Sequence, residues 1–358
     1  MDHITDAMDM VDHMIQPAFC VREGIIVKAN PAAAARMIEA GSSISDLLHT
    51  GQEEYEAFQD GCLYLTLSLA GQELGAAVTR KKDFDLFLLE SESDRGELKA
   101  LALAARELRD PLSGIMITTD RLFSGTATED PETLEQLARI NRNLFQILRL
   151  VGNMADASRY AAGSSMNQEV RDVRAIISET VNKAAALAEH TGIRIQQNLH
   201  PEPVFSLVDT EKLERAVFNI LSNALKFTPG GETLRVSLTR RGNKLYFTVS
   251  DSGCGIQENL RGSLFSRYTR EPALEDSRHG IGLGLVLIRA AAAIHGGTVL
   301  VDQPEQQGTR VTMTMAIRPG NSQNLRSPIM KVDYAGEMDH GLIEFSDILP
   351  TKLYDIKK

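Results

Sequence analysis

The sequence predicts a multidomain α+β protein in which a helical unit separates two mixed units. The chain has 358 residues, 43% of them hydrophobic, which is enough for two or three cores at a domain size of roughly 100 to 200 residues. Short apolar runs alternate with turns near both ends, whereas the middle shows apolar spacings of three and four, which are typical of helices. We therefore expect units at 1–92, 93–164 and 168–318, followed by a C-terminal extension at 319–358.

Composition and charge exclude several classes of protein. The net charge is -10 and no stripe of Lys and Arg is present, which argues against a nucleic-acid partner. No apolar run approaches the roughly 18 residues that a membrane span needs, and the N-terminus lacks the pattern of a signal peptide. Cys20, Cys62 and Cys254 have no metal-ligand spacing and suit a reducing compartment. We therefore expect a cytoplasmic protein without a membrane span.

The first unit reads as a small sensor domain. "PAFCV" and "IIVKA" predict a hairpin with Gly24 in its turn. A helical middle follows, and "CLYLTLSLAG", "ELGAAVTR" and "DFDLFLLES" predict three further strands. This order resembles a PAS sensory domain, and "IIVKANPAAAARMI" resembles the second strand and first helix of that family. Another small α+β domain remains the alternative.

The middle unit predicts two amphipathic helices joined by a short loop. Their apolar seams, at spacings of three and four, run through Leu98, Leu101, Ala105, Leu108, Leu112 and Ile115, and then through Leu137, Ile140, Leu144, Ile147, Val151 and Met154. Two such helices cannot enclose a core alone, so a four-helix bundle made by two chains completes it. This predicts a homodimer through the helical hairpin. A hairpin packed on its own chain is the alternative.

In the third unit, mixed helical and strand-like runs predict a two-layer α+β sandwich. One of its helices has a polar face. In "NILSNALKF", Asn219, Asn223 and Lys226 follow at i, i+4 and i+7 and so share one face of the helix. Two amides and a lysine on one face suit a magnesium–polyphosphate group. Magnesium prefers oxygen ligands and usually keeps several waters, so a single amide oxygen plus phosphate oxygens is an adequate site.

Two glycine-rich segments follow that helix. In "VSDSGCGI" a strand ends at Asp251, whose carboxylate can accept a hydrogen bond from an exocyclic amine such as that of adenine; Gly253 and Gly255 allow the backbone to approach a ligand. In "HGIGLGLVLIRA" three glycines precede a helix whose N-terminus can receive phosphate. A dinucleotide-binding fold is the competing explanation, but these glycines lack a preceding strand in a βαβ unit.

Together, and in this order, these segments resemble the N, G1, F and G2 boxes of the GHKL ATP-binding fold of sensor histidine kinases. The matching stretches are "NILSNALKF", "DSGCGI", "SLFSRYTR" and "GIGLGL", and "QGTRVTMTM" resembles the closing G3 element. The resemblance implies ATP and Mg²⁺ as cofactors, with Asn223 holding the metal. The nucleotide-binding residues that it implies are Asn219, Asn223, Lys226, Asp251, Gly253, Gly255, Arg267, Arg270, Gly280, Gly282, Leu283, Gly284 and Thr309.

"LALAARELRDPLSGI", residues 101–115, resembles the dimerisation and phosphotransfer helix of the same family, with one difference that matters. The family motif runs His, Glu, Leu, Arg, a small polar residue, Pro, Leu; here Arg106 stands in place of the histidine and Asp110 in place of the small polar residue. Glu107 occupies the position of the activating acid. A guanidinium has no free lone pair to attack phosphorus. Arg106 either binds the γ-phosphate of ATP or is a solvated surface residue.

We therefore expect a histidine-kinase-family signalling protein that binds ATP–Mg²⁺ without phosphorylating itself at the usual position. It would regulate a partner kinase or a response regulator, with signals passing from the sensor unit down the hairpin. Phosphorylation of a partner in trans, on His or on Ser/Thr, is one alternative. A non-catalytic dimeric scaffold is the other, and Asp110 places phosphatase activity in doubt.

Overall fold

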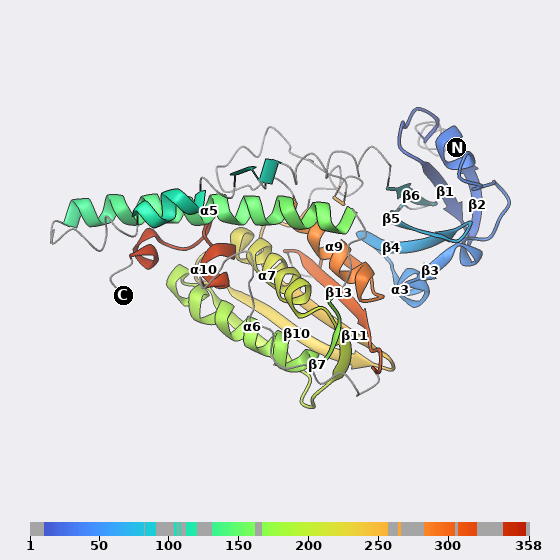
Figure 1. Ribbon diagram of the computed structural model, residues 1–358. Coiled ribbons are helices and arrows are strands. Elements are labelled where there is room, and N and C mark those ends of the chain that lie inside the picture. Colours follow the sequence, from blue (N-terminus) through green and yellow to red (C-terminus); the bar gives the residue numbers. More distant parts are fainter. Residues whose placement is uncertain are drawn as a thin grey trace.

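The computed structural model describes residues 11–81, 83–90, 104–105, 107–108, 112–119, 131–161, 167–256, 264–265, 283–304, 307–320 and 339–355. Within these ranges an N-terminal β-rich unit and a larger α/β unit lie side by side, with a long helix across the larger unit (Figure 1). One eleven-stranded sheet runs through both units in the order β2-β1-β6-β5-β4-β12-β13-β11-β10-β8, with β3 paired to β4 off this path.

The N-terminal unit contains the five strands expected from the sequence and a sixth, β3, within the stretch that was predicted to be helical. They are β1 (Ala18–Arg22), β2 (Ile25–Ala29), β3 (Leu48–Thr50), β4 (Cys62–Leu69), β5 (Gln72–Arg80) and β6 (Asp85–Leu89), with α2 (Pro31–Ala34), η1 (Ile44–Asp46) and α3 (Gln52–Ala57) between them. The β1–β2 turn consists of Glu23 and Gly24, both at positive φ (52° and 79°), as a type I′ hairpin requires. Phe19 stacks on Phe87 at 4.7 Å in the fully buried core. Apart from β3, the order is the predicted one of two strands, small helices and three more strands.

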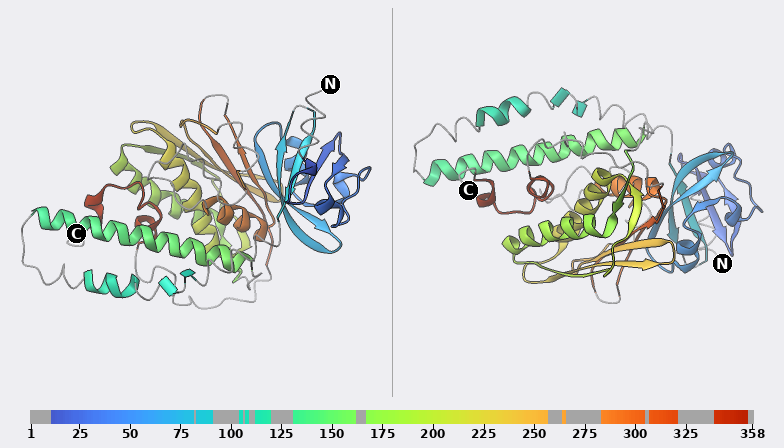
Figure 2. Two further views of the ribbon diagram at one scale, coloured as in Figure 1. Left: turned by 90° about the horizontal axis from the view of Figure 1, so that it is seen from above. Right: turned by 60° about the horizontal axis from the view of Figure 1, so that its bottom comes forward.

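The hairpin region contains one long helix, α5 (Pro131–Ala161), beside the helical residues 112–119, and these lie along α5 in both views of Figure 2. The predicted seam of α5 divides between two environments. Leu144, Val151 and Met154 are buried in the core shared with the larger unit, whereas Ile140 and Ile147 remain 46% and 39% exposed. The seam therefore packs partly within the chain and partly faces outward.

The larger unit is a two-layer sandwich. Helices α6 (Val173–Ala188), α7 (Thr210–Phe227) and α9 (Gly284–Ile294) cover one face of β8 (Arg194–Leu199), β10 (Thr233–Arg241), β11 (Lys244–Ser250), β12 (Val299–Asp302) and β13 (Arg310–Ala316) (Figures 1 and 2). Burial alternates along β11, because one face packs on the helices and the other does not. Helix α7 begins where the Asp209 side chain accepts from the Lys212 N–H.

A short strand that the sequence did not predict precedes the first helix of the larger unit. Residues Glu169–Asp172 form strand β7, which pairs with β9 (Phe205–Val208) in a second, two-stranded sheet. Helix α6 begins at Val173, the first residue of the helical run "VRAIISETVNKAAALAEHTG", and Asp172 caps it by accepting from the Arg174 N–H. A short turn, η2 (Glu189–Thr191), follows this helix.

The two units are joined by strand pairing. Strand β4 of the N-terminal unit pairs antiparallel with β12 of the larger unit, with Tyr64 opposite Val299 and Cys62 opposite Val301. A Cβ on Gly61 would overlap the backbone carbonyl of Val301, so the absence of a side chain permits this close approach.

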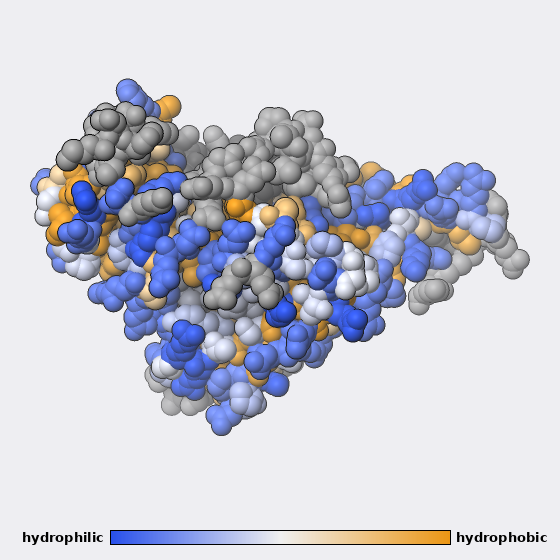
Figure 3. All heavy atoms as spheres, turned by 180° about the vertical axis from the view of Figure 1, so that it is seen from behind, coloured by the Kyte–Doolittle hydropathy of each residue, from blue (hydrophilic) through white to orange (hydrophobic). Residues whose placement is uncertain are grey.

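The C-terminal residues form α10 (His340–Glu344) and η4 (Thr351–Tyr354), which lie between α5 and the sandwich (Figure 1). Seen from behind, the described surface is mostly hydrophilic, with apolar atoms gathered mainly over the N-terminal unit (Figure 3). Among the described helices, none combines the length and the apolar character that crossing a lipid bilayer would require.

Candidate nucleotide-binding site

Helix α7 supplies the polar face predicted from the sequence. Asn219 is fully buried and its Nδ2 donates to the Arg215 carbonyl at 2.9 Å, while its Oδ1 has no hydrogen-bond partner. Asn223 and Lys226, one and two turns further on, are half-buried. Since a buried amide oxygen without a partner is costly, the site has capacity for a donor that the protein itself does not supply.

The start of α9 faces this amide pair. A Cβ on Gly284 would stand 3.2 Å from Asn219 Oδ1 and 3.5 Å from Asn223 Nδ2, so the glycine brings the helix backbone against both amides. The N-cap residue, Leu283, is buried and offers no side-chain cap. The first N–H groups of α9 are therefore not capped by a side chain of that residue, and a helix N-terminus of this kind favours anions.

Asp251 lies at the end of β11 as the sequence predicted. Its Oδ1 accepts from the Gly253 N–H at 2.9 Å and from the Thr309 N–H at 3.0 Å. Both bonds fall on Oδ1, which leaves Oδ2 for a ligand. Burial raises the pKa of the Asp251 carboxyl above its ordinary value, and the two backbone donors oppose this shift.

The glycines around Asp251 are required by close packing. A Cβ on Gly253 would overlap the carbonyl oxygen of Phe227, the last residue of α7. Gly308 has φ of +133°, and a Cβ there would overlap the Asp251 carbonyl. Gly255, at φ +76°, adopts the left-handed conformation that favours glycine. The carboxylate and the end of α7 are thereby held next to each other.

Several predicted residues lie outside the described ranges: Arg106, Asp110, Arg267, Arg270, Gly280 and Gly282. Glu107 is described and is exposed on the hairpin. The structure thus brings together Asn219, Asn223 and Gly284 in one group, and Asp251, Gly253 and Thr309 in a second group that borders the end of α7.

The sequence analysis did not predict a contact that the structure shows between α9 and the N-terminal unit. Arg289 of α9 lies 3.0 Å from Glu90, donates to the Phe265 carbonyl at 2.8 Å and stands over the Tyr64 ring at 5.1 Å. The Tyr64 hydroxyl donates to Glu90 at 2.9 Å. Phe265 belongs to the "SLFSRYTR" segment, so this contact connects the N-terminal unit with two parts of the predicted site. No spacing in the sequence signals it, because its members come from separate segments.

The residues present fit ATP with magnesium. An amide oxygen of Asn223 is a suitable hard ligand for Mg²⁺, the N-terminus of α9 suits phosphate, and the Asp251 carboxylate suits an amine. The unpartnered Asn219 Oδ1 and the cradle at Gly284 are the observations that support this fit.

Comparisons with known proteins agree with this geometry. Residues 208–319 match the model of the histidine kinase-, DNA gyrase B- and HSP90-like ATPase family. The chain is 30% identical over 271 residues to hybrid signal transduction histidine kinase D of Dictyostelium discoideum, covering 72% of this chain and 17% of that protein. It is 26% identical over 243 residues to the sensor-like histidine kinase SenX3 of Mycolicibacterium smegmatis, covering 65% and 62%.

A solved structure shares the fold. Full-length ShkA, crystallised with AMPPNP, has a TM-score of 0.51 and 23% identity, covering 62% of this chain and 46% of that one. Fold and site thus define a GHKL-type ATPase domain. The chain belongs to the sensor histidine kinase family. It spans less than two thirds of the length of each of these relatives.

Proposed function

We propose that this protein binds ATP–Mg²⁺ and regulates a partner kinase or a response regulator without phosphorylating itself at the usual position. The observation that carries the first part is the buried, unpartnered Asn219 Oδ1 facing Gly284 at the start of α9. The substitution of the acceptor histidine by Arg106 carries the second part.

Each residue has a role that its position supports. Asn223 would hold the magnesium ion, which neutralises phosphate charge when bound. Lys226 and the N-terminal backbone of α9 would bind phosphate oxygens, as would Arg267, Arg270, Gly280 and Gly282 from the same boxes. Asp251 Oδ2 would accept from the adenine amine, with the carboxylate oriented by the Gly253 and Thr309 N–H groups.

Arg106 argues against autophosphorylation for a chemical reason. A guanidinium stays protonated far above neutral pH and offers no nucleophilic lone pair there. Glu107 occupies the place of the activating acid but has no imidazole beside it to activate. Asp110 replaces the small polar residue of the motif, so we expect little phosphatase activity.

We further propose that the chain forms a homodimer through the hairpin. The exposed large apolar residues of this region are Leu108, Ile115, Ile117, Ile140 and Ile147. Burial of such side chains by a second copy is favourable by about 25 cal/mol per Å², and two antiparallel helices rarely stand alone. Cys20, Cys62 and Cys254 form no disulfide, which suits a cytoplasmic location, and we also propose that location.

The decisive experiment combines calorimetry with phosphate labelling. Purified protein is titrated with a non-hydrolysable ATP analogue and Mg²⁺, and separately incubated with γ-labelled ATP and treated with acid or alkali. We expect saturable binding that Asp251→Asn weakens and the exposed-site control Asp46→Asn does not, with no label on the protein.

The other outcomes decide between the alternatives. Label that is stable to alkali but labile to acid would overturn the proposal that Arg106 does not accept phosphate. Acid-stable label would favour a kinase that acts on Ser or Thr, and label that appears only on an added partner would favour phosphorylation in trans. Absence of nucleotide binding would leave a dimeric scaffold as the function.

A further inference from the structure

The C-terminal segment, residues 339–355, is packed between helix α5 and the ATPase domain. Its residues Ile343, Phe345 and Leu349 are buried. The Phe345 ring meets that of Phe218 on α7 at 5.7 Å, and the Tyr354 ring meets that of Phe145 on α5 at 5.3 Å. One short segment therefore binds both parts through apolar contacts.

Side chains of α5 also donate hydrogen bonds to main-chain carbonyls of the C-terminal segment. Asn141 Nδ2 donates to the Tyr354 carbonyl at 2.9 Å. Arg142 Nε and Gln146 Nε2 both donate to the Ser346 carbonyl, at 2.8 Å and 3.2 Å. These donors occupy successive turns of one helix face, so the segment lies along α5 in a fixed register.

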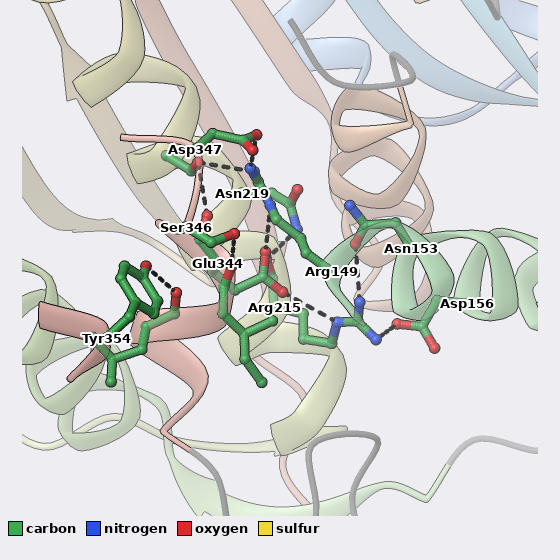
Figure 4. A network of polar contacts seen from close by, with 12 residues as sticks. Arg149, Asn153, Asp156, Arg215, Asn219, Glu344, Ser346, Asp347 and Tyr354 are labelled. Atoms are coloured by element: carbon green, nitrogen blue, oxygen red, sulfur yellow. Dashed lines mark hydrogen bonds and ion pairs between the residues drawn. The ribbon is translucent and has the colours of Figure 1, made fainter. Parts of the chain in front are cut away.

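A buried group of charged side chains joins α5, α7 of the ATPase domain and the C-terminal segment (Figure 4). The carboxylate of Glu344 is fully buried and lies 3.2 Å from Arg149 Nε of α5 and 3.8 Å from Arg215 Nε of α7. Asp347 adds a second carboxylate, 2.7 Å from Arg149. Arg149 also donates to Ser222 Oγ of α7 at 2.8 Å.

This buried charged group is continuous with the nucleotide site. Arg215 pairs with Asp156 of α5 and donates to Asn153 at 2.9 Å, and its carbonyl accepts from Asn219, one helical turn away. Arg149 and Arg215 are almost fully buried. Without residues 339–355, Arg149 loses both carboxylates, and a buried charge without a partner is strongly unfavourable.

We propose that residues 339–355 are an intramolecular restraint that holds the ATPase domain against α5, with Glu344 as its central contact. The segment fixes the orientation of the nucleotide site relative to the hairpin, and its release frees the ATPase domain to move. Every contact in this proposal joins residues of the chain to one another, so the proposal does not rest on the proposed ATP binding.

Hydrogen–deuterium exchange on the full chain tests the restraint. Glu344→Gln is compared with the wild type and with Glu132→Gln, which makes the same charge change at an exposed site on α5. We expect exchange in residues 141–153 and 339–355 to quicken by about tenfold or more in Glu344→Gln. The control and the paired strands β11 and β13 should exchange as in the wild type.

A truncated chain ending at residue 338 provides the second variant. We expect exchange in residues 141–153 to quicken as in Glu344→Gln, and a synthetic peptide of residues 339–355 to reverse this. Unchanged exchange in either variant would overturn the proposal. A general loss of protection that includes β11 and β13 would also overturn it, because the segment would then belong to the ATPase core. Nucleotide is absent throughout, so a failure here is distinct from a failure to bind ATP.

Discussion

The carboxylate of Glu90 lies 3.0 Å from the guanidinium of Arg289, which joins the residue after the last strand of the N-terminal unit to the helix that begins at the glycine-rich segment. The sequence led us to expect coupling only through the hairpin helices. The structure adds a direct contact, because β4 pairs with β12 and places the two units edge to edge.

Removing this ion pair should destabilise the protein more than removing an exposed one. In Glu90→Gln, Arg289, whose side chain is only 7% exposed, loses its carboxylate. We expect the free energy of unfolding in urea to fall by about 2 kcal/mol. The control is Glu135→Gln, whose partner Arg139 is 67% exposed, and its cost should stay below about 0.5 kcal/mol. Equal effects of the two variants would contradict a structural role for Glu90.

Asn223 should matter for magnesium-dependent nucleotide binding and little for folding. Its side chain is half-buried beside Gly284, so Asn223→Ala removes a ligand oxygen without opening a large cavity. Calorimetry with an ATP analogue should give about a tenfold to hundredfold weaker Kd when Mg²⁺ is present. Asn198→Ala, an exposed change on β8, should leave the Kd unaltered. A Kd unaffected by Asn223→Ala would remove the residue from the site.

Nucleotide affinity should fall as the solution becomes more acidic. Burial raises the pKa of Asp251, and a bound amine donor favours the ionised carboxylate, so binding lowers this pKa and releases a proton. Protonation of free Asp251 therefore competes with binding. We expect a weaker Kd at about pH 5 than at about pH 7.5, and a flatter profile in Asp251→Asn. Tighter binding in acid would contradict this role for the carboxylate.

The buried His295 should make folding sensitive to acid. Its Nε2 accepts from the Asp209 N–H at 3.1 Å, its Nδ1 lies 2.7 Å from the Ala291 carbonyl, and burial lowers its pKa. The unfolded chain then takes up a proton near pH 6.5 that the native state resists, so the free energy of unfolding falls as pH drops below that value.

Thermal unfolding across that pH range measures the effect. The wild type should lose more of its Tm on acidification than His295→Gln, even though the variant starts from a lower Tm. His190→Gln, at an exposed site, should follow the wild type. An identical pH dependence in His295→Gln would refute the assignment.

The exposed face of the hairpin should control the oligomeric state. Ile140 and Ile147 are seven residues apart and so share one face of α5. The wild type should be a dimer by light scattering after gel filtration, and the double variant Ile140→Asp, Ile147→Asp should be a monomer. Ile25→Asp, at a similarly exposed site on β2, should remain dimeric. A monomeric wild type at micromolar concentration would refute the proposed dimer.

The sequence alone determined the local elements and the groups of the nucleotide site. The runs "RIQQNL", "TLRVSLT", "KLYFTVSD", "GTVLVDQ" and "TRVTMTMAI" predict strands, and "TEKLERAVFNILSNALKFT" predicts a helix. Strands β8, β10, β11, β12 and β13 and helix α7 lie at these runs, because alternation and a spacing of 3.6 residues are local signals. Asn219 and Asn223 share a face, and Asp251 ends its strand, for the same reason. Strand β7 was missed, because its four residues are held by pairing with β9, which lies more than thirty residues further along the chain.

Only the tertiary structure decided how the parts contact one another. Strand β4 pairs with β12, Glu90 meets Arg289, and Glu344 lies between Arg149 and Arg215. Each of these contacts joins residues that are remote in the chain, so no pattern within one segment specifies it. Charges that look like ordinary surface residues in the sequence become buried partners once two units pack together, because a buried charge needs an opposite charge close to it.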